Sequence, residues 1–493
     1  MTVAIGSPQH SNPDYGKFLG CARVYKYIDN DWNMIVPKID PILPSYKGDT
    51  TKHYFGKSIA LSGDSSTLIV GAPYEPGDFD GYAYGYICSY NLVHQSLKNE
   101  NFNILKFGSD INGKNINANC GYSVSLSGSG LIMAIGSSKG THATKNSPGY
   151  VEIYKWSNND WNQIGTIYGE DYEDFGRSIS LSNDGKIVAI GAVFNDSNGY
   201  NDSGCARIYE YDNNDDQWKQ LGSDINGETN NENFGWSVSL SANGKIVAIS
   251  SPYSNSNKGR VCIYDYVEGR SPKEWKQIGD TIDGEATSDY SGYSVSLNSD
   301  GTIVAIGSYR ATDNNYGSVN VYKWSDTSWN IMGSSITGKA YNQRLGHCVT
   351  LSSDGFIIAI ASHFPYNKGS VNVYQWSNNE WINMGYDLNM ECDGSRYTKY
   401  IALNDDGNIL AIGSSGYNYN GSNIDSGRVQ VYKFYENNWI QIGKNIYGDV
   451  AYDLAGSSIS LNGKGNILCV GSRNVNANNL NNSGRVRTYE IVQ

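Results

Sequence analysis

The stretch Arg177-Ser-Ile-Ser-Leu181, Ser182-Asn-Asp-Gly185 and Ile187-Val-Ala-Ile190-Gly191 decides the fold of this chain. Polar and apolar residues alternate in its first part, which is typical of a half-buried strand. The middle part ends in glycine, which suits a tight turn. The last part is an apolar run that fits a strand covered on both faces. The stretch therefore predicts two antiparallel strands joined by a short turn.

The same pair of strands recurs along the chain. Its leucine returns every 52 to 65 residues, at Leu61, Leu126, Leu181, Leu240, Leu297, Leu351, Leu403 and Leu461. A third strand closes on a tyrosine, as at Tyr209, and a fourth opens on an aromatic residue, as at Trp218. We therefore predict an all-β fold, a β-propeller of four-stranded antiparallel blades. A solenoid is the competing interpretation, but the rungs of a parallel β-helix are usually much shorter than this repeat.

Counting the first strands gives eight blades, with seven blades plus extra strands as the alternative. We expect one propeller domain over residues 1–493, with a partial unit at 1–45 and repeat units that begin near residues 56, 121, 176, 235, 292, 346, 398 and 456. N-terminal strands near 3–6, 22–27 and 32–35 are expected to close the ring with the C-terminal strands, which removes open sheet edges. Two strands are then spare, and self-association through them is one expected use.

The residues before the first strands carry a family resemblance. Phe55-Gly56, Phe175-Gly176 and Phe234-Gly235 precede first strands, and Val70-Gly71-Ala72-Pro73 closes a second strand. The chain resembles the FG-GAP repeats of integrin α-chain propellers and their microbial relatives. That resemblance implies a propeller used for interaction. Integrin-like repeats often hold calcium between strands one and two, but the short turn at Asn183-Asp-Gly185 offers too few oxygens for six to eight ligands.

Composition narrows the function classes. The net charge of the 493 residues is −12, and the 37 lysines and arginines form no basic stripe, so no nucleic-acid partner is expected. No run of 18 apolar residues predicts a membrane span, and the first residues do not have the pattern of a signal peptide. We therefore expect an intracellular or particle-associated protein, and extracellular use stays open.

The connections between strands two and three are long and different in every repeat, whereas those between strands one and two are short and uniform. Variable insertions on one face of a repeat array usually mark its binding surface. Aromatic residues in these loops are the predicted binding residues: Phe194, Tyr200, Tyr253, Tyr309, Tyr316, Phe364, Tyr366, Tyr417 and Tyr419. The competing interpretation is that each ring folds over its own blade as a lid.

Metal and cofactor signals are weak. Asp196, Asn198 and Asp202 lie close together in one loop and could ligate a hard cation, but turns use the same residue types for local backbone bonds. His347 and His363 fall in one repeat and are the only histidine pair of note. No cofactor is expected, and calcium is not favoured.

No unique catalytic constellation stands out, so no catalytic residue is assigned. We predict a non-enzymatic interaction scaffold that presents its variable loop face to a protein or glycan partner, and a structural or surface role on a particle such as a virion fits this prediction. The alternative is a carbohydrate-active hydrolase or lyase with its site at the axial mouth. That alternative needs two carboxylates about 5–10 Å apart at the mouth.

Overall fold

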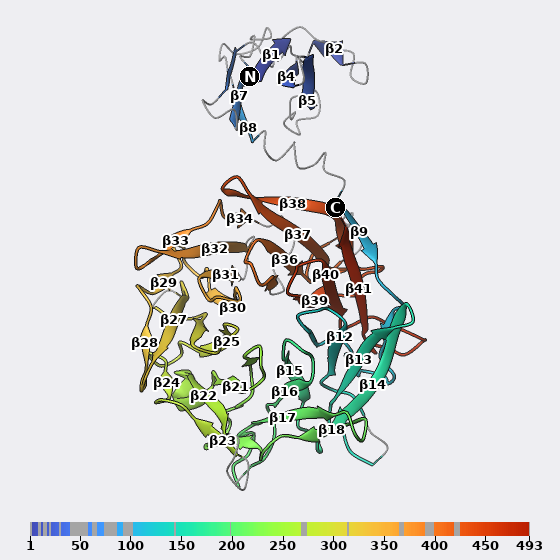
Figure 1. Cartoon of the computed structure of the whole chain (residues 1–493), viewed down its shortest axis with the longest axis vertical. Coiled ribbons are helices and arrows are strands. Elements are labelled where there is room, and N and C mark those ends of the chain that lie inside the picture. The colour runs from blue at the N-terminus through green and yellow to red at the C-terminus, as the bar shows by residue number, and fades with distance from the viewer. Residues whose placement is uncertain are drawn as a thin grey trace, which may run out of the picture. The chain divides into compact units, whose positions relative to one another are not determined.

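The computed structural model describes residues 102–492, apart from 142–143, 198, 268–273, 313–314, 364–368, 390–398 and 419–423, and within residues 1–101 only the strands. The chain divides into two compact units, residues 1–102 with 493 and residues 103–492. The second unit is a β-propeller, with its sheets arranged radially about an axis (Figure 1). The predicted architecture of four-stranded antiparallel blades is confirmed.

Seven sheets form the propeller, and each follows the order of strands one to four from the axis outward. The first strands are β11 (Ser123–Leu126), β15 (Phe175–Leu181), β20 (Val238–Leu240), β25 (Ser291–Leu297), β30 (Leu345–Leu351), β35 (Lys399–Leu403) and β39 (Ala455–Leu461). The second strands are β12 (Ile132–Ser137), β16 (Ile187–Ala192), β21 (Ile246–Ser251), β26 (Ile303–Ser308), β31 (Ile357–Ser362), β36 (Ile409–Ser414) and β40 (Ile467–Ser472).

The outer strands are longer or interrupted. The third strands are β13 (Tyr150–Ser157), β17 (Cys205–Asp212), β22 (Arg260–Val267), β27 (Ser318–Ser325), β32 (Ser370–Ser377), β37 (Arg428–Tyr435) and β41 (Arg485–Val492). The fourth strands are continuous in β14 (Asp160–Tyr168) and β38 (Asn438–Tyr447). Elsewhere they are split in two: β18 (Gln217–Gln220) and β19 (Ile225–Asn226), β23 (Glu274–Gln277) and β24 (Ile282–Asp283), β28 (Ser328–Ile331) and β29 (Ile336–Thr337), β33 (Glu380–Asn383) and β34 (Leu388–Asn389), and β9 (Asn103–Lys106) and β10 (Ile111–Asn112). A short helical turn, α2 (Ser254–Asn257), lies between β21 and β22.

The prediction of eight blades is wrong and the alternative of seven blades is confirmed, because β9 and β10 pair with β41 and complete the sheet of β39 and β40. We call the sheet of β39, β40, β41, β9 and β10 the closing sheet. It combines C-terminal strands with an earlier segment, but that segment is 103–112 and not the predicted N-terminal strands. The strands predicted to close the ring form their own sheet of β1 (Thr2–Ser7), β4 (Cys21–Ile28) and β5 (Asp31–Ile39). The repeat with Leu61 forms the sheet of β6 (Ser58–Leu61), β7 (Thr67–Ala72) and β8 (Tyr86–Asn91), and a separate hairpin consists of β2 (Ser11–Asn12) and β3 (Lys17–Phe18).

The prediction of one domain over 1–493 stays a prediction, because the two units are described separately. Within the second unit, the first strands begin close to the predicted repeat starts, as β15 does at Phe175 and β25 at Ser291. The ring is therefore built from consecutive repeats, and only its closing sheet takes strands from two distant parts of the chain.

A ring of seven backbone hydrogen bonds joins the turns between strands one and two. Each turn donates one N–H to a carbonyl of the next turn, over 2.8 to 3.0 Å. The donors, in order around the axis, are Gly128, Asn183, Ala242, Ser299, Ser353, Asp405 and Gly463, and the bond from Gly463 returns to Gly128. Since the series returns to its start after seven steps, the seven-blade ring is closed.

Serine hydroxyls of the first strands join neighbouring sheets. The Oγ atom of Ser180 accepts the N–H of Leu240 in the next sheet at 2.9 Å, and Ser239 does the same for Leu297. This explains why the first strands alternate serine with leucine. The leucine is buried between sheets, and the serine satisfies a backbone group across the gap between sheets.

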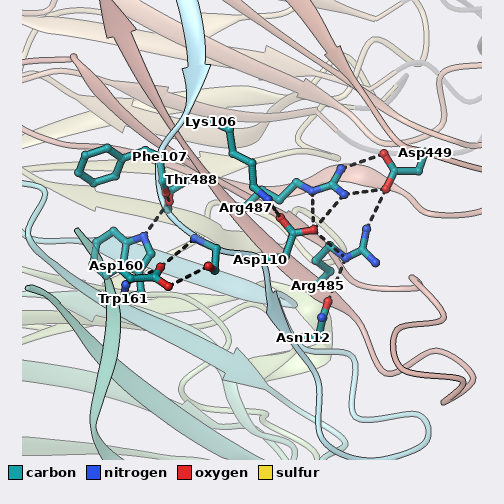
Figure 2. Close-up of polar contacts among 11 residues, drawn as sticks. Lys106, Phe107, Asp110, Asn112, Asp160, Trp161, Asp449, Arg485, Arg487 and Thr488 are labelled. Carbon is teal, nitrogen blue, oxygen red and sulfur yellow. Dashed lines mark hydrogen bonds and ion pairs between the residues drawn. The ribbon is translucent and has the colours of Figure 1, made fainter. Parts of the chain in front are cut away.

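The hydrophobic core consists of layers between neighbouring sheets. The layer between the closing sheet and the sheet of β11–β14 contains Ile111, Met133, Trp161 and Val486, all at most 9% exposed. Phe107 stacks on Trp156 with ring centroids 3.8 Å apart. Figure 2 shows the polar contacts beside this layer, including the Trp161 indole N–H, which donates to Thr488 Oγ1 at 2.8 Å.

Five of the six tryptophans that open outer strands in the described propeller donate an indole hydrogen bond to the neighbouring sheet, and Trp218 is the exception. The indole N–H of Trp275 donates to the Leu221 carbonyl of the preceding sheet at 2.7 Å, and Trp381 donates to the Met332 carbonyl at 2.9 Å. Each of these five indoles therefore bridges the gap between two blades at their outer edge.

The Phe-Gly pairs have a local structural reason. Phe234 is 1% exposed and belongs to the core layer between two sheets. Gly235 adopts φ +91°, and a Cβ atom there would lie 2.4 Å from the Cys205 carbonyl oxygen. A left-handed backbone and a close backbone approach both require glycine.

Candidate binding face and axial cavity

The loops between strands two and three and those between strands four and one lie at the same end of each antiparallel sheet. We call this end of the propeller the loop face. The axis opens on it in a cavity of about 440 Å³. First-strand residues of all seven sheets line the cavity, for example Ser123, Ser294 and Ser458.

The residue four positions before the recurring leucine of each first strand sets the chemistry of the cavity. Five sheets place a large lining side chain at this position: Tyr122, Arg177, Trp236, Tyr293 and His347. Tyr400 lines the cavity from the next position of its own strand, and Arg473, from the loop after β40, adds a second arginine. Among the described residues, no carboxylate lines the cavity. The lining is therefore aromatic and cationic, in a protein whose net charge is −12.

Aromatic rings from three consecutive sheets meet beside this cavity. Trp236 lies 4.9 Å from Tyr253 and 5.5 Å from Tyr293, measured between ring centroids. Tyr293 contacts Tyr309 at 4.4 Å and His347 at 4.7 Å. We call these residues, with Tyr290 and His363, the axial aromatic cluster.

Two arginines stack on rings of the cavity wall. The Arg177 guanidinium carbon lies 3.9 Å from the Trp236 ring centroid and 5.5 Å from that of Tyr122. Arg473 lies 5.4 Å from the same Tyr122 ring. Cation–π contacts of this kind hold a guanidinium in place without neutralising its charge. Arg177 also forms an ion pair with Asp174 at 3.1 Å, and its side chain is 20% exposed.

Burial sets the protonation of the neighbouring rings. It raises the pKa of Tyr293, Tyr253 and Tyr309, so these phenols stay neutral at physiological pH. Burial, together with the neighbouring His363 and the positive charge of Arg344, lowers the pKa of His347 to about 3. The cationic charge at the cavity therefore comes from arginine and does not depend on histidine.

The predicted loop aromatics do not form a single surface. Tyr253 and Tyr309 belong to the axial aromatic cluster, and His347 and His363 are brought together there, with ring centroids 5.5 Å apart. Phe194 and Tyr200 are both 41% exposed. Tyr316 is half-buried, while Phe364, Tyr366 and Tyr419 lie outside the described residues.

Tyr417 follows the lid interpretation. Its ring lies 4.0 Å from the guanidinium carbon of Arg428, which belongs to β37 of the same sheet, and 5.9 Å from Tyr447 of β38. Tyr417 therefore packs over its own blade, whereas Phe194 and Tyr200 keep exposed surface.

Sequence reasoning missed the most exposed of the described rings on the loop face. Tyr172 is 65% exposed, Tyr341 69% and Tyr452 56%, and all three lie in loops between strands four and one. Ile116 occupies the corresponding loop of another sheet and is 56% exposed. Ile116, Tyr172 and Tyr341 each follow a glycine by three residues, which is the signal that could have found them.

The candidate cation loop forms a turn that recurs without charge. Asp196 Oδ1 accepts the N–H of Asp202 at 2.8 Å, and Asn198 lies outside the described residues. Asn476 Oδ1 accepts the N–H of Asn482 at 2.8 Å in the same way in another blade. An amide therefore replaces the carboxylate in this turn. No group of three or more metal-ligating side chains occurs in the described part of the chain.

A deeply buried ion pair lies away from the cavity lining. Glu173 is 2% exposed and accepts two hydrogen bonds from Arg207, at 2.7 and 2.8 Å. It also accepts the backbone N–H of Glu170 at 2.8 Å. Burial alone would raise the pKa of Glu173, but these contacts, above all those from Arg207, hold it below its ordinary value. Glu232 accepts the backbone N–H of Glu228 at the same place in the next sheet, which indicates a structural role.

No helix in the part of the chain that the structure describes has the length and apolarity needed to cross a membrane.

The chain matches known proteins among solved structures. No family model matches the chain, and no curated protein matches it. A structure described as Kuenenia stuttgartiensis hydrazine synthase is similar, with 12% identity and a TM-score of 0.48, over 73% of this chain and 93% of that one. A likeness at this level says nothing about what this chain does.

Proposed function

We propose that this protein is a non-enzymatic interaction scaffold, and that its loop face binds a protein or glycan partner. The observation that carries the proposal is the exposure of Tyr172, Tyr341 and Tyr452 on that face. Exposed tyrosines are enriched in binding hot spots, since they bury a large area and lose little conformational entropy.

The rest of the propeller supports this proposal. Backbone bonds between turns, serine bonds between first strands and indole bonds between outer strands join the blades, so the loops stand on a rigid ring. Binding residues on a rigid support lose less entropy when a partner binds. The resemblance to FG-GAP propellers is consistent with such a use and stays a prediction.

The enzyme alternative finds less support. A glycosidase at the axial mouth would need two carboxylates, and the described lining of the cavity contains none. Asp174, which pairs with the lining residue Arg177, is only 7% exposed.

The test compares two triple variants of the full chain. Tyr172→Ser, Tyr341→Ser and Tyr452→Ser together remove the exposed rings of the loop face. Asn183→Ser, Asp300→Ser and Asp354→Ser change turns between strands one and two, which lie at the other end of the sheets. Both variants and the parent are incubated with a glycan array and with proteins from the native source. We expect only the tyrosine variant to lose the bound partner while both unfold cooperatively. Equal binding by all three would show that the loop face is not the binding surface.

A further inference from the structure

We propose that the axial cavity binds an anionic sugar unit, with a carboxylate or sulfate group facing Arg473 and Arg177 and the sugar ring against the aromatic rings of the lining. This inference rests on the proposed function, since it names a ligand class for the loop face. It assigns to the cavity a role separate from that of the exposed tyrosines.

The charge of the cavity is the first argument. Arg177 and Arg473 line it, and no carboxylate of the described residues does. Arg177 is paired with Asp174, which is not part of the lining, so Arg473 provides the positive charge that no described carboxylate compensates. Both guanidinium groups lie within 5.5 Å of the Tyr122 ring centroid, so they flank the same part of the wall. Arg473 forms no ion pair with any described carboxylate. A recess lined by one sign of charge attracts a ligand of the opposite sign more strongly than a flat surface does.

The shape and the aromatic lining are the second argument. A volume of about 440 Å³ lies in the range of small-molecule sites. One face of a pyranose ring carries mainly C–H groups, which pack against aromatic rings. Tyr122, Trp236 and Tyr293 provide such rings around the axis.

The serine hydroxyls of the lining are the third argument. Ser123 donates its O–H to the Gly176 carbonyl at 2.7 Å, and Ser178 donates to the Gly235 carbonyl at 2.8 Å. A hydroxyl that donates one bond keeps oxygen lone pairs as acceptors. These oxygens can accept the hydroxyl groups of a sugar or the backbone N–H groups of a peptide. The aromatic rings of the lining, which suit the C–H face of a pyranose, therefore favour a glycan over an acidic peptide.

The experiment measures binding to the full chain by calorimetric titration and ligand-observed NMR. The probes are methyl β-D-glucuronide, methyl β-D-glucoside 6-sulfate, the neutral methyl β-D-glucoside, and N-acetylglutamate amide as the acidic peptide mimic. We expect at least one anionic sugar to bind more than about tenfold tighter than the neutral sugar, and to weaken as salt is raised. The two anionic sugars distinguish a uronate from a sulfated source.

Two variants and a control locate the site. Arg473→Gln removes one charge of the cavity without leaving a described carboxylate unpaired, and should weaken the anionic sugar about 10- to 100-fold. Trp236→Leu removes an aromatic ring of the lining together with the ring that holds Arg177, and should weaken both the neutral and the anionic sugar. Lys339→Gln removes one exposed charge from a loop of the same face outside the cavity lining, and should change nothing.

Several results would overturn the inference. One is the absence of saturable binding of any sugar at about 10 mM, a concentration at which even ligands with millimolar dissociation constants are detected. A second is that the neutral sugar or N-acetylglutamate amide binds as tightly as the anionic sugars. A third is an unchanged affinity for the anionic sugar in Arg473→Gln. The proposed function fails separately, because its readout is the loss of a partner in the tyrosine variant. Sugar binding that persists in that variant would support the cavity even if the exposed tyrosines prove unimportant.

Discussion

A disulfide between β9 and β41 should lock the propeller ring. Leu105 lies directly opposite Glu490 in the antiparallel pair that closes the ring. Opposed residues of such a pair have Cα atoms about 4.5–5.5 Å apart and side chains on the same face. Disulfides need a Cα separation of about 4.4–6.8 Å. Leu105→Cys with Glu490→Cys should therefore form a bridge without moving the backbone.

The expected stabilisation follows from the length of the bridged loop. The bridge would close roughly 385 residues, for which the chain-entropy model gives about 6 kcal/mol. Engineered bridges usually deliver less, so we expect about 2–4 kcal/mol. For a unit of this size that corresponds to a rise in melting temperature of about 2–5 °C.

The assay compares oxidised and reduced protein by calorimetry, with the bridge mapped by mass spectrometry. Of the eight cysteines of the chain, Cys120, Cys205, Cys262, Cys348 and Cys469 are unpaired in the propeller and four of these are buried, so they should not compete for the thiol introduced in β9. The mass map checks for pairing with the other three. The control is Leu105→Cys with Thr327→Cys, an exposed position in the sheet of β25–β29, which should not form a bridge. If no bridge forms between the two strands, or if the control bridges equally well, closure of the ring by β9 is refuted.

Three further predictions test the packing and the buried charges. Trp275→Ala removes the indole bond to Leu221 and should cost about 3 kcal/mol, lowering the midpoint of a single calorimetric transition that chelators leave unchanged. Arg207→Met leaves Glu173 buried without its cation and should cost about 3–5 kcal/mol in urea unfolding, and adding Glu173→Gln should restore part of the loss. Burial lowers the pKa of His347 to about 3 in the folded protein, whereas its unfolded value lies near 6.5. The contribution of the neutral imidazole to the free energy of unfolding is therefore complete above about pH 6.5, and below that pH it falls by up to about 1.4 kcal/mol per pH unit. His347→Gln should therefore show a shallower loss of stability between about pH 6.5 and 4.

The blade was predictable from sequence, whereas the number of blades was not. Alternating residues such as those of β15, and the apolar run of β16, determine strands locally. The strand that pairs with β9 lies far from it in the sequence. β9 follows β8 in sequence but pairs with β41. Beside this pairing Asp110 forms an ion pair with Arg487 at 3.0 Å (Figure 2), and Ile111 is buried in the core. Counting leucines counts first strands and cannot show which sheet an outer strand completes.

The axial cavity was hidden from sequence reasoning for a related reason. Tyr122, Arg177, Trp236 and His347 occupy one position of the repeat and differ between copies, so along the chain they look like unrelated variation. Only the closed ring makes them neighbours, because the first strands turn the same position toward one axis. In a closed repeat fold, the residues that occupy a variable position at the inner end of the first strands therefore come together around one axis. In this chain that set combines aromatic rings with arginine, which is why the cavity, rather than any single loop, carries the ligand proposal.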